Sequence, residues 1–306
     1  MKVFVPMLAA HAGIQDQDLL EEDVRLHLLL DGLTGDVSVG PNLIFKGGTC
    51  LIKCYLDYPR FSTDLDFTWR RQSAWESLGT KALRRALRPV QRGFLGRLAG
   101  HAAAQGLQFD PDRDVQYGQS NRMMTALLHY ESVARLPGLV KVQVNFTERL
   151  LYSTKRVEAH SLLKGDLPGA LRLLDSDLPI RYAQPVHVEA YDPREILAEK
   201  GRAILTRTAA KARDLLDLYL LEARFGLKLE NHAADVLTKT RLAVAQAERY
   251  HDQLETVGDR FELLLDEDVA PLLLKPVDEV AFEAYRGRAV AIMGRLAEQV
   301  GSGDVP

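Results

Sequence analysis

The passage from Leu43 to Trp69 constrains the fold of this chain more than any other part of the sequence. It opens with the apolar run 43–45, continues through Gly47-Gly48, and reaches further apolar positions at 51–52. This order predicts a strand, a tight turn and a helix. Residues 64–69 then alternate polar and apolar side chains, which predicts a second strand with both of its acids on one face.

The chain on either side of this passage has two different characters. Residues 14–33 place apolar side chains at helical spacing, and residues 138–146 alternate β-branched and polar side chains as a strand does. From about Pro193 onward, helical patterns take over. Two of these helical patterns occupy residues 236–251 and 277–300.

These patterns predict a two-domain protein of the α/β class. We expect an α/β domain with a mixed sheet over residues 1–188, followed by a helical C-terminal domain over residues 189–306. A length of 306 residues agrees with two domains, since single domains usually have about 100–200 residues.

Composition identifies an ordinary globular protein and excludes two other classes. Apolar residues make up 46% of the chain, which is ample for a core and excludes disorder of the whole chain. Lys and Arg number 39 against 42 Asp and Glu, so the formal charge of −3 excludes a generally basic nucleic-acid coat protein.

Targeting signals and cysteine usage favour a cytoplasmic protein. No run approaches the roughly 18 apolar residues that span a bilayer, so we expect no membrane partner. The only cysteines, Cys50 and Cys54, lie four residues apart, which suits reduced thiols in a core better than a structural disulfide or a zinc site.

The chemistry of the 43–69 passage lies in its turn and its second strand. Glycines at 47 and 48 allow a phosphate to approach the backbone at a helix start, and Thr49 adds a hydroxyl group. Asp64 and Asp66 project from one face of a strand, close enough to bind a hard cation together. A phosphate cradle followed by a metal-binding acid pair is the minimum apparatus for metal-assisted phosphoryl or nucleotidyl transfer.

The same passage resembles a known family. The run K-G-G-T-x-L at 46–51, followed by R-F-S-x-D-L-D-F at 60–67, is similar to the signature of AbiEii-type nucleotidyltransferases. These are toxins of type IV toxin–antitoxin and abortive-infection systems with a polymerase-β-like catalytic core. Three weaker similarities support the resemblance by their order, namely Glu22-Asp23 in the first long helix, residues 195–207 and residues 213–221.

The resemblance implies roles for particular residues. Asp64 and Asp66 would hold Mg²⁺ and act in catalysis together with Lys200 and Asp217. The NTP phosphates would contact the glycine turn and its neighbours, which are Lys46, Gly47, Gly48, Thr49 and Ser62. Ser62 also matches a position that is phosphorylated in some members. Taken without the resemblance, Lys200 is best explained as a solvated helix lysine, and the resemblance makes a functional role an equally good explanation.

The resemblance further implies a reaction and its partners. We expect Mg²⁺-dependent transfer of NMP from an NTP to an acceptor hydroxyl, with the 3′ end of tRNA or another RNA as acceptor. We expect the active site in a cleft between the domains, and a cognate antitoxin encoded by a neighbouring gene. Two alternatives stay open: an acceptor that is a small molecule or a protein, and a degenerate member that binds nucleotide or a partner without turnover.

One position departs from the family pattern. Polymerase-β-like sites commonly use a third carboxylate on a later strand, where the family has V-E-I-N and this chain has Val142-Gln143-Val144-Asn145. Gln143 is neutral, so it is no base and a weaker Mg²⁺ ligand. Either Glu148, Glu189 or Asp217 takes over this task, or the enzyme is slow.

A basic stretch follows the second strand. No acid occurs between Glu76 and Asp110, whereas six cations do, and a break or kink is expected at Pro89. Most of these cations fall on one helical face, which is either an ordinary solvated face or a phosphate-binding surface for RNA. The six are Lys81, Arg84, Arg85, Arg88, Arg92 and Arg97.

Overall fold

The computed structural model divides the chain into two compact units, which are described separately below. The first comprises residues 1–149 and 154–191, and the second comprises residues 150–153 and the chain from 192 onward. The structure describes residues 1–301 apart from a small set of positions. The positions left out are 76, 119–120, 209–210, 247–249, 251–252, 255, 259–260 and 262–268.

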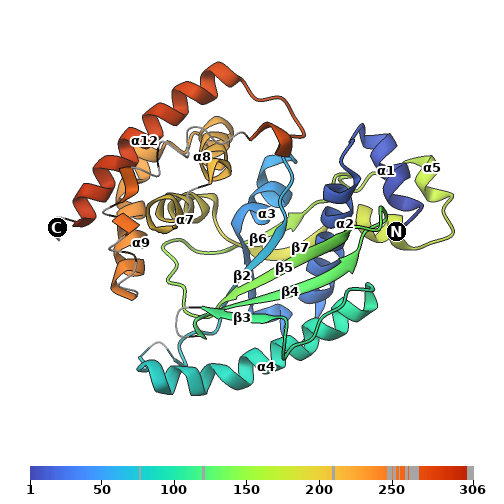
Figure 1. Cartoon of the computed structure of the whole chain (residues 1–306), viewed down its shortest axis with the longest axis horizontal. Helices are drawn as coiled ribbons and strands as arrows, with labels where there is room; N and C mark the ends of the chain where they lie inside the picture. Colours follow the sequence, from blue (N-terminus) through green and yellow to red (C-terminus); the bar gives the residue numbers. More distant parts are fainter. Residues whose placement is uncertain are drawn as a thin grey trace. The chain divides into compact units, whose positions relative to one another are not determined.

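The first unit is a seven-stranded mixed sheet with helices (Figure 1). Its strands are β1 (Leu43–Lys46), β2 (Asp64–Trp69), β3 (Val115–Gly118), β4 (Met123–Glu131), β5 (Pro137–Asn145), β6 (Lys155–Ala159) and β7 (Val186–Ala190). Its α-helices are α1 (Phe4–Ala12), α2 (Gln17–Gly35), α3 (Gly47–Leu51), α4 (Thr80–Ala104), α5 (Gly169–Arg172) and α6 (Leu178–Ala183). A 3₁₀ turn, η1 (Gly40–Asn42), precedes β1, and a π-helical turn, η2 (Ile52–Leu56), continues α3.

Strand order places the acid-bearing strand at the centre of the sheet. The order is β3-β4-β5-β2-β1-β7-β6, in which β2 runs antiparallel to β1 and parallel to β5. Within β2, Leu65 and Phe67 are buried, while Asp64 and Asp66 on the other face are half-buried. The alternation predicted from the sequence is therefore confirmed, and both acids lie on one face of the strand.

The long helix α2 begins at a side-chain cap and packs against the sheet. The Asp16 carboxylate accepts a hydrogen bond from the Leu19 backbone N–H, 2.9 Å away, which satisfies one of the unpaired N–H groups at the helix start. Its apolar side chains at Leu20, Val24 and Leu28 are buried, and α2 contacts β2, β5 and β7. The helix expected at 14–33 is thus confirmed, with its start shifted by three residues and its end by two.

Helix α4 continues through Pro89, where a break or a kink is expected. One helix runs from Thr80 to Ala104 with Pro89 inside it, so the helix does not break there. Proline removes one hydrogen bond to the carbonyl four residues earlier, here that of Arg85. Both Pro89 and Arg85 are exposed, so this carbonyl lies on the solvent side of the helix, where water satisfies it.

The second unit is helical, as the sequence predicts. Its described helices are α7 (Pro193–Thr206), α8 (Ala212–Phe225), α9 (Ala233–Gln246) and α12 (Glu279–Gly301), with 3₁₀ turns η4 (Leu229–His232) and η5 (Ala270–Leu272). Helix α7 is buried along most of its length and contacts α8, α9 and α12. Of the helical pattern predicted at 236–251, the last residues lie outside the described residues.

Close packing of α7 on α9 depends on a glycine and a buried ion pair. A Cβ at Gly201 would lie only 2.6 Å from a methyl group of Val236, so only glycine allows this approach. Beside it, Lys239 Nζ lies 2.6 Å from Glu195 Oε1, with both side chains buried. The other Glu195 oxygen accepts the backbone N–H groups of Leu151 and Tyr152, which attaches residues 150–153 to this unit.

The structure also reports on membrane crossing and on the cysteines. Among the residues described, no helix is both long enough and apolar enough to cross a membrane. Cys50 is buried and Cys54 half-buried, and neither forms a disulfide. The expectation of reduced thiols at these two positions is confirmed.

Candidate active site

The glycine turn and the acid pair meet at the centre of the sheet. Lys46 at the end of β1 lies opposite Asp66 of β2 in the antiparallel register, so Gly47 follows directly beside this acid. Gly47 has a φ of +77°, and a Cβ there would lie 2.3 Å from Asp66 Oδ2. Both the backbone conformation and the close approach require glycine. The turn predicted as a phosphate cradle therefore borders one of the two predicted metal ligands.

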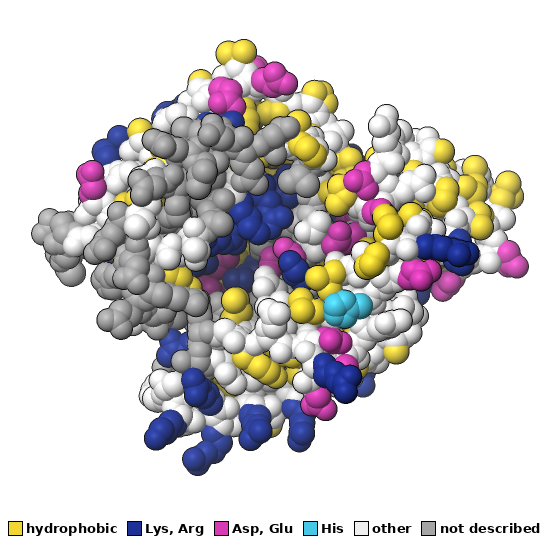
Figure 2. All heavy atoms as spheres, in the orientation of Figure 1, with side chains coloured by type: hydrophobic (Ala, Val, Ile, Leu, Met, Phe, Trp, Pro, Cys, Tyr) yellow, Lys and Arg dark blue, Asp and Glu magenta, His cyan; other side chains and the backbone are white. Residues whose placement is uncertain are grey.

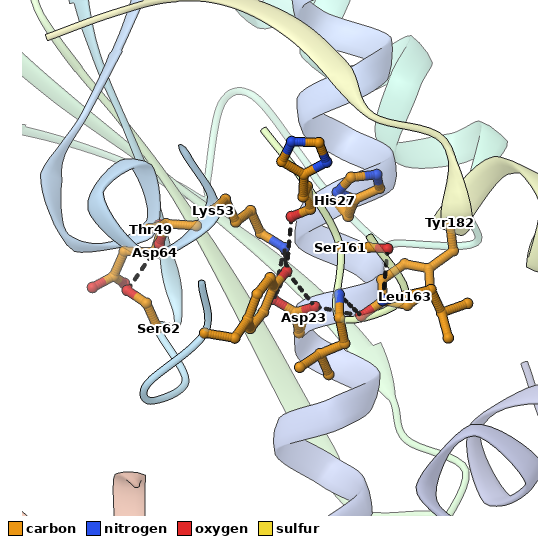
Figure 3. Close-up of polar contacts among 12 residues, drawn as sticks. Asp23, His27, Thr49, Lys53, Ser62, Asp64, Ser161, Leu163 and Tyr182 are labelled. Carbon is orange, nitrogen blue, oxygen red and sulfur yellow. Dashed lines mark hydrogen bonds and ion pairs between the residues drawn. The ribbon is translucent and has the colours of Figure 1, made fainter. Parts of the chain in front are cut away.

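Two hydroxyl groups connect the turn to the start of β2 (Figure 3). Thr49 Oγ1 lies 2.5 Å from the Asp64 carbonyl, which accepts its proton, and 2.8 Å from Ser62 Oγ. Because a threonine hydroxyl has a single proton, Ser62 donates to Thr49 whenever Thr49 donates to Asp64. Thr49 is buried and Ser62 half-buried. Thr49 thus fixes the turn to the acid strand, and Ser62 is the more accessible of the two hydroxyls.

Lys46 lies at the edge of this group. Its ammonium is 3.7 Å from Glu148 Oε2 and 5.6 Å from the centre of the Tyr191 ring. Lys46 therefore pairs with an acid in the structure. Because of this pair, Glu148, which follows β5, lies close to the end of β1. That end lies opposite Asp66.

Gln143, a neutral residue, occupies the position where the family pattern has the third carboxylate. Gln143 of β5 lies directly opposite Asp66 of β2 in the parallel register, so the two side chains share one face. Its amide donates a 2.8 Å hydrogen bond to Thr125 Oγ1 of β4. Within the described part of the chain, no group of three or more His, Cys, Asp or Glu side chains is arranged to hold a metal.

Two carboxylates nonetheless fit Mg²⁺ chemically. Mg²⁺ is usually bound by one or two carboxylates and completed by water and substrate phosphates, rather than by an all-protein cage. Asp64 and Asp66 supply such oxygens from one face of a strand, beside a turn whose backbone approaches Asp66 closely. The residues present therefore suit a cation that arrives with a nucleotide.

The acids named as substitutes for the third carboxylate differ in their surroundings. Glu189 is bonded to Thr154 and paired with Arg70 and Arg156. Although burial opposes ionisation, these partners hold the pKa of Glu189 below its usual value, so it is a poor base. Glu148 instead accepts a hydrogen bond of 2.8 Å from Asn145, and it pairs with Lys46.

A further carboxyl group near the acid pair was not identified as a site residue from the sequence. Burial and, second, the charge of Asp64 raise the pKa of Glu22 to about 8, with Lys141 acting in the opposite direction. Glu22 lies on α2 and is half-buried. The resemblance had pointed to Glu22-Asp23 as a segment, but its placement beside Asp64 depends on how α2 crosses the sheet.

Lys200 and Asp217 contact each other in the second unit. Lys200 Nζ of α7 lies 2.6 Å from Asp217 Oδ2 and 2.6 Å from Asp214 Oδ1, both of α8. Burial opposes ionisation of Asp214, but Lys200 and Arg207 lower its pKa to about 2. All three residues of this ion-pair cluster are buried, so the interpretation of Lys200 as a solvated helix lysine is wrong.

A buried charge pair attaches the glycine-turn helix to α2 (Figure 3). Lys53, in the π-helical turn that continues α3, places its Nζ 2.7 Å from Asp23 Oδ1 of α2, and both residues are 2% exposed. Two tyrosines complete the site: Tyr182 of α6 donates to Asp23 Oδ2 over 2.7 Å, and the Tyr58 hydroxyl contacts both Asp23 and Lys53. The partners of this carboxylate come from two parts of the chain, residues 53–58 and α6.

His27 lies one turn further along α2, against the same pair. Its Nε2 donates to the Gln184 carbonyl over 2.9 Å, and its ring meets that of Tyr182 edge to face. Burial and the charge of Lys53 lower the pKa of His27 to about 3, against the opposing effects of the Gln184 carbonyl and Asp23. The imidazole is therefore neutral in the folded protein over the physiological pH range.

Comparisons with known proteins identify one family and one similar solved structure. The family model described as "Nucleotidyl transferase AbiEii toxin, Type IV TA system" matches residues 28–291. Among solved structures, MenT4, a nucleotidyltransferase toxin from Mycobacterium tuberculosis H37Rv, is similar with a TM-score of 0.57 and 20% sequence identity. That similarity covers 98% of this chain and 94% of MenT4. No curated protein sequence matches the chain.

The buried pair predicts a large loss of stability when one partner is removed. Lys53→Met leaves the Asp23 carboxylate buried without its cation, so the free energy of unfolding should fall by about 3–5 kcal/mol in urea titrations. Lys164→Met is the matched control, because Lys164 pairs with Asp57 at the surface and should lose less than about 1 kcal/mol. Equal losses in the two variants would contradict the role assigned to Lys53.

The low pKa of His27 predicts acid lability with a definite sign. The unfolded chain binds a proton on this residue below about pH 6.5, and the folded protein does so only near pH 3. Stability from His27 is therefore present above pH 6.5 and lost as the pH falls towards 3, by up to about 1.4 kcal/mol per pH unit.

His27→Gln isolates this contribution, because its amide still donates to the Gln184 carbonyl but does not titrate. Urea unfolding between pH 6.5 and 4 should show a shallower pH dependence in His27→Gln than in the unmodified protein. His187→Gln is the control, since the His187 side chain is 83% exposed. An identical pH dependence in all three proteins would show that His27 is not the responsible group.

Proposed function

The chain belongs to the AbiEii family of nucleotidyltransferase toxins of type IV toxin–antitoxin systems, and on this basis we propose the particular reaction that it performs. It transfers NMP from an NTP to the 3′ hydroxyl of an RNA, with tRNA as the acceptor. The acceptor oxygen forms a bond to the α-phosphorus, the bond from that phosphorus to the bridging oxygen breaks, and pyrophosphate leaves. The proton of the acceptor hydroxyl passes to a base or to solvent.

One observation supports this reaction more than any other: the glycine turn touches the acid pair. A turn that admits a phosphate at Gly47 brings it beside Asp66, because the space that a Cβ would fill lies 2.3 Å from Asp66 Oδ2. Phosphate and carboxylate repel each other unless a cation lies between them. The geometry therefore favours a nucleotide that binds together with a divalent cation held by Asp64 and Asp66.

The residues of the first unit have distinct roles in this proposal. Mg²⁺, when bound, supplies positive charge that offsets the charge developing on the phosphates. Gly47 and Gly48 offer backbone N–H groups to the triphosphate, and Thr49 holds the turn against β2. Ser62 and Lys46 bind phosphate oxygens, for which Lys46 exchanges its contact with Glu148.

The proposal also gives roles to Lys200 and Asp217 of the second unit. A lysine held by two carboxylates keeps a fixed position, which suits a group that binds a triphosphate. The protein acts in the cytoplasm, and its partner is a cognate antitoxin encoded by a neighbouring gene. The family supports the antitoxin partner, and the free cysteines suit the cytoplasm.

Labelled nucleotide tests the reaction and its acceptor together. The protein is incubated with Mg²⁺, total RNA and NTPs that carry label at the α-phosphate, and RNA, protein and small-molecule fractions are then separated. Nucleotidyl transfer to RNA places the label in the RNA fraction and releases unlabelled pyrophosphate. Asp64→Ala should reduce both signals by a factor of about 10³ or more, since the cation loses a ligand at the reacting phosphate.

Asp31→Ala is the matched control, because Asp31 is an exposed acid of α2 in the same unit. It should label RNA as the unmodified protein does. Label in the protein or small-molecule fraction would instead identify a protein or a small molecule as the acceptor. No pyrophosphate release with any acceptor would identify a non-catalytic member of the family.

The close approach of Gly47 to Asp66 predicts a second loss of activity. Gly47→Ala puts a methyl group into the position of the Asp66 carboxylate, so NMP transfer should fall about 100-fold or more. Gly106→Ala has the same left-handed backbone, with φ of +69°, but nothing lies within 4 Å of its added Cβ. Gly106→Ala should lose about 1–2 kcal/mol of stability and keep its activity. Equal activities in the two variants would contradict the proposed cradle.

A further inference from the structure

One face of α4 carries a continuous stripe of cations. Lys81, Arg85, Arg88 and Arg92 follow one another at spacings of four, three and four residues, and Arg84 lies beside them. Such spacing places side chains on one side of a helix. All five are exposed, and from Lys81 to Arg92 the stripe is about 16 Å long. Figure 2 shows these cations as a row along the edge of the molecule formed by α4.

The stripe is separate from the ionic contacts that hold α4 in place. Arg97, the sixth cation of the basic stretch, lies 2.6 Å from the buried carboxylate of Asp36 and thus serves packing. Helix α4 itself contains no acid. Among the described residues, none of the acids lies within 4.0 Å of a charged nitrogen of the five stripe cations. The stripe therefore presents net positive charge to solvent on a chain whose formal charge is −3.

An exposed aromatic side chain lies next to the stripe. Tyr117 of β3, at the edge of the sheet, is 46% exposed. Burial raises the pKa of the Tyr117 phenol, and Arg88 acts in the opposite direction, so Arg88 is close enough for its charge to act on the phenol. Helix and strand are also connected by Gln91, whose amide donates to the Asn121 carbonyl beyond β3 over 2.8 Å.

We propose that the stripe of Lys81, Arg84, Arg85, Arg88 and Arg92, together with Tyr117, binds a single-stranded segment of RNA. The cations contact successive backbone phosphates, and the Tyr117 ring stacks on an unpaired base. This inference rests on the proposed RNA acceptor, and it assigns to α4 the binding of that acceptor at a distance from the reacting phosphate. Cations that follow a backbone beside an aromatic stacking surface are the usual means of binding single strands.

RNA fits this face better than an acidic protein does. Carboxylates would satisfy the cations equally well, but they give no reason for an exposed aromatic ring beside the stripe. Four of the five cations are arginines, whose planar guanidinium groups bind phosphate with two hydrogen bonds and stack on bases. The ring and the arginines together therefore favour a partner with both phosphates and flat bases.

Binding of a labelled oligoadenylate, measured by fluorescence anisotropy without NTP, tests the proposal. The triple variant Arg84→Gln, Arg85→Gln, Arg88→Gln removes three phosphate contacts, so the slope of log K against log salt concentration should become shallower by about 2. Tyr117→Ala should weaken binding about five- to a hundredfold with an unchanged slope, and Tyr117→Phe should bind as the unmodified protein does.

The control removes the same charge elsewhere in the first unit. Lys2→Gln, Arg156→Gln and Arg172→Gln neutralise three exposed cations outside α4 and should leave the slope unchanged. An equal change of slope in this control, or none in the α4 variant, would overturn the proposal. So would displacement of the oligoadenylate by polyglutamate at equal charge, which would assign the face to an acidic protein.

The binding experiment distinguishes failure of this inference from failure of the proposed reaction. If the α4 face does not bind RNA, the slopes coincide while the unmodified protein still labels RNA with NMP. If the reaction is wrong but the face binds RNA, the slopes differ while no RNA is labelled. Transfer assays on the α4 variant should show a raised KM for RNA and an unchanged KM for NTP.

Discussion

The buried pair of Asp23 and Lys53 is the contact on which the arrangement of the site depends. Lys53 belongs to the turn that continues α3, and α3 begins at the glycine turn. Asp23 belongs to α2, which crosses the sheet beneath the acid-bearing strand. Two charges buried this completely are costly unless they are bonded to each other and to further polar groups. The pair joins α2 to the turn that continues α3, and it thereby helps to hold the glycine turn beside β2.

From this placement follow the short contacts that define the site. With α3 held by Lys53, the chain at Gly47 passes directly beside Asp66, and Thr49 reaches the Asp64 carbonyl. The glycine turn therefore contacts both Asp64 and Asp66. The same helix α2 brings Glu22 close to Asp64, where burial raises its pKa. The acid site is more crowded with carboxyl groups than the strand sequence indicates, although the third strand position is the neutral Gln143.

Acidic and basic side chains lie in different parts of the first unit. Carboxyl groups gather at the centre of the sheet, around Asp64, while the exposed face of α4 has a stripe of cations and no acid. Nearly equal numbers of both signs conceal this separation in the formal charge of −3. A site that handles a nucleotide with a cation, and a face that binds an RNA backbone, need opposite local fields. Separation of the two charges within one unit is consistent with both tasks.

The sequence by itself determined several features that depend on local periodicity. The strand at 64–69, with both acids on one face, the glycine turn before it and the helical second half were all predictable, because side-chain direction alternates along a strand and repeats along a helix. Continuation of α4 through Pro89 was not predicted, since it depends on which side of the helix faces water. The tertiary structure alone decided which distant residues meet. Gln143 lies opposite Asp66 because of strand register, Glu22 lies near Asp64 because of how α2 crosses the sheet, and Asp23 pairs with Lys53 across 30 residues of chain. Register and helix packing are set by the burial of whole faces, so no local pattern contains them.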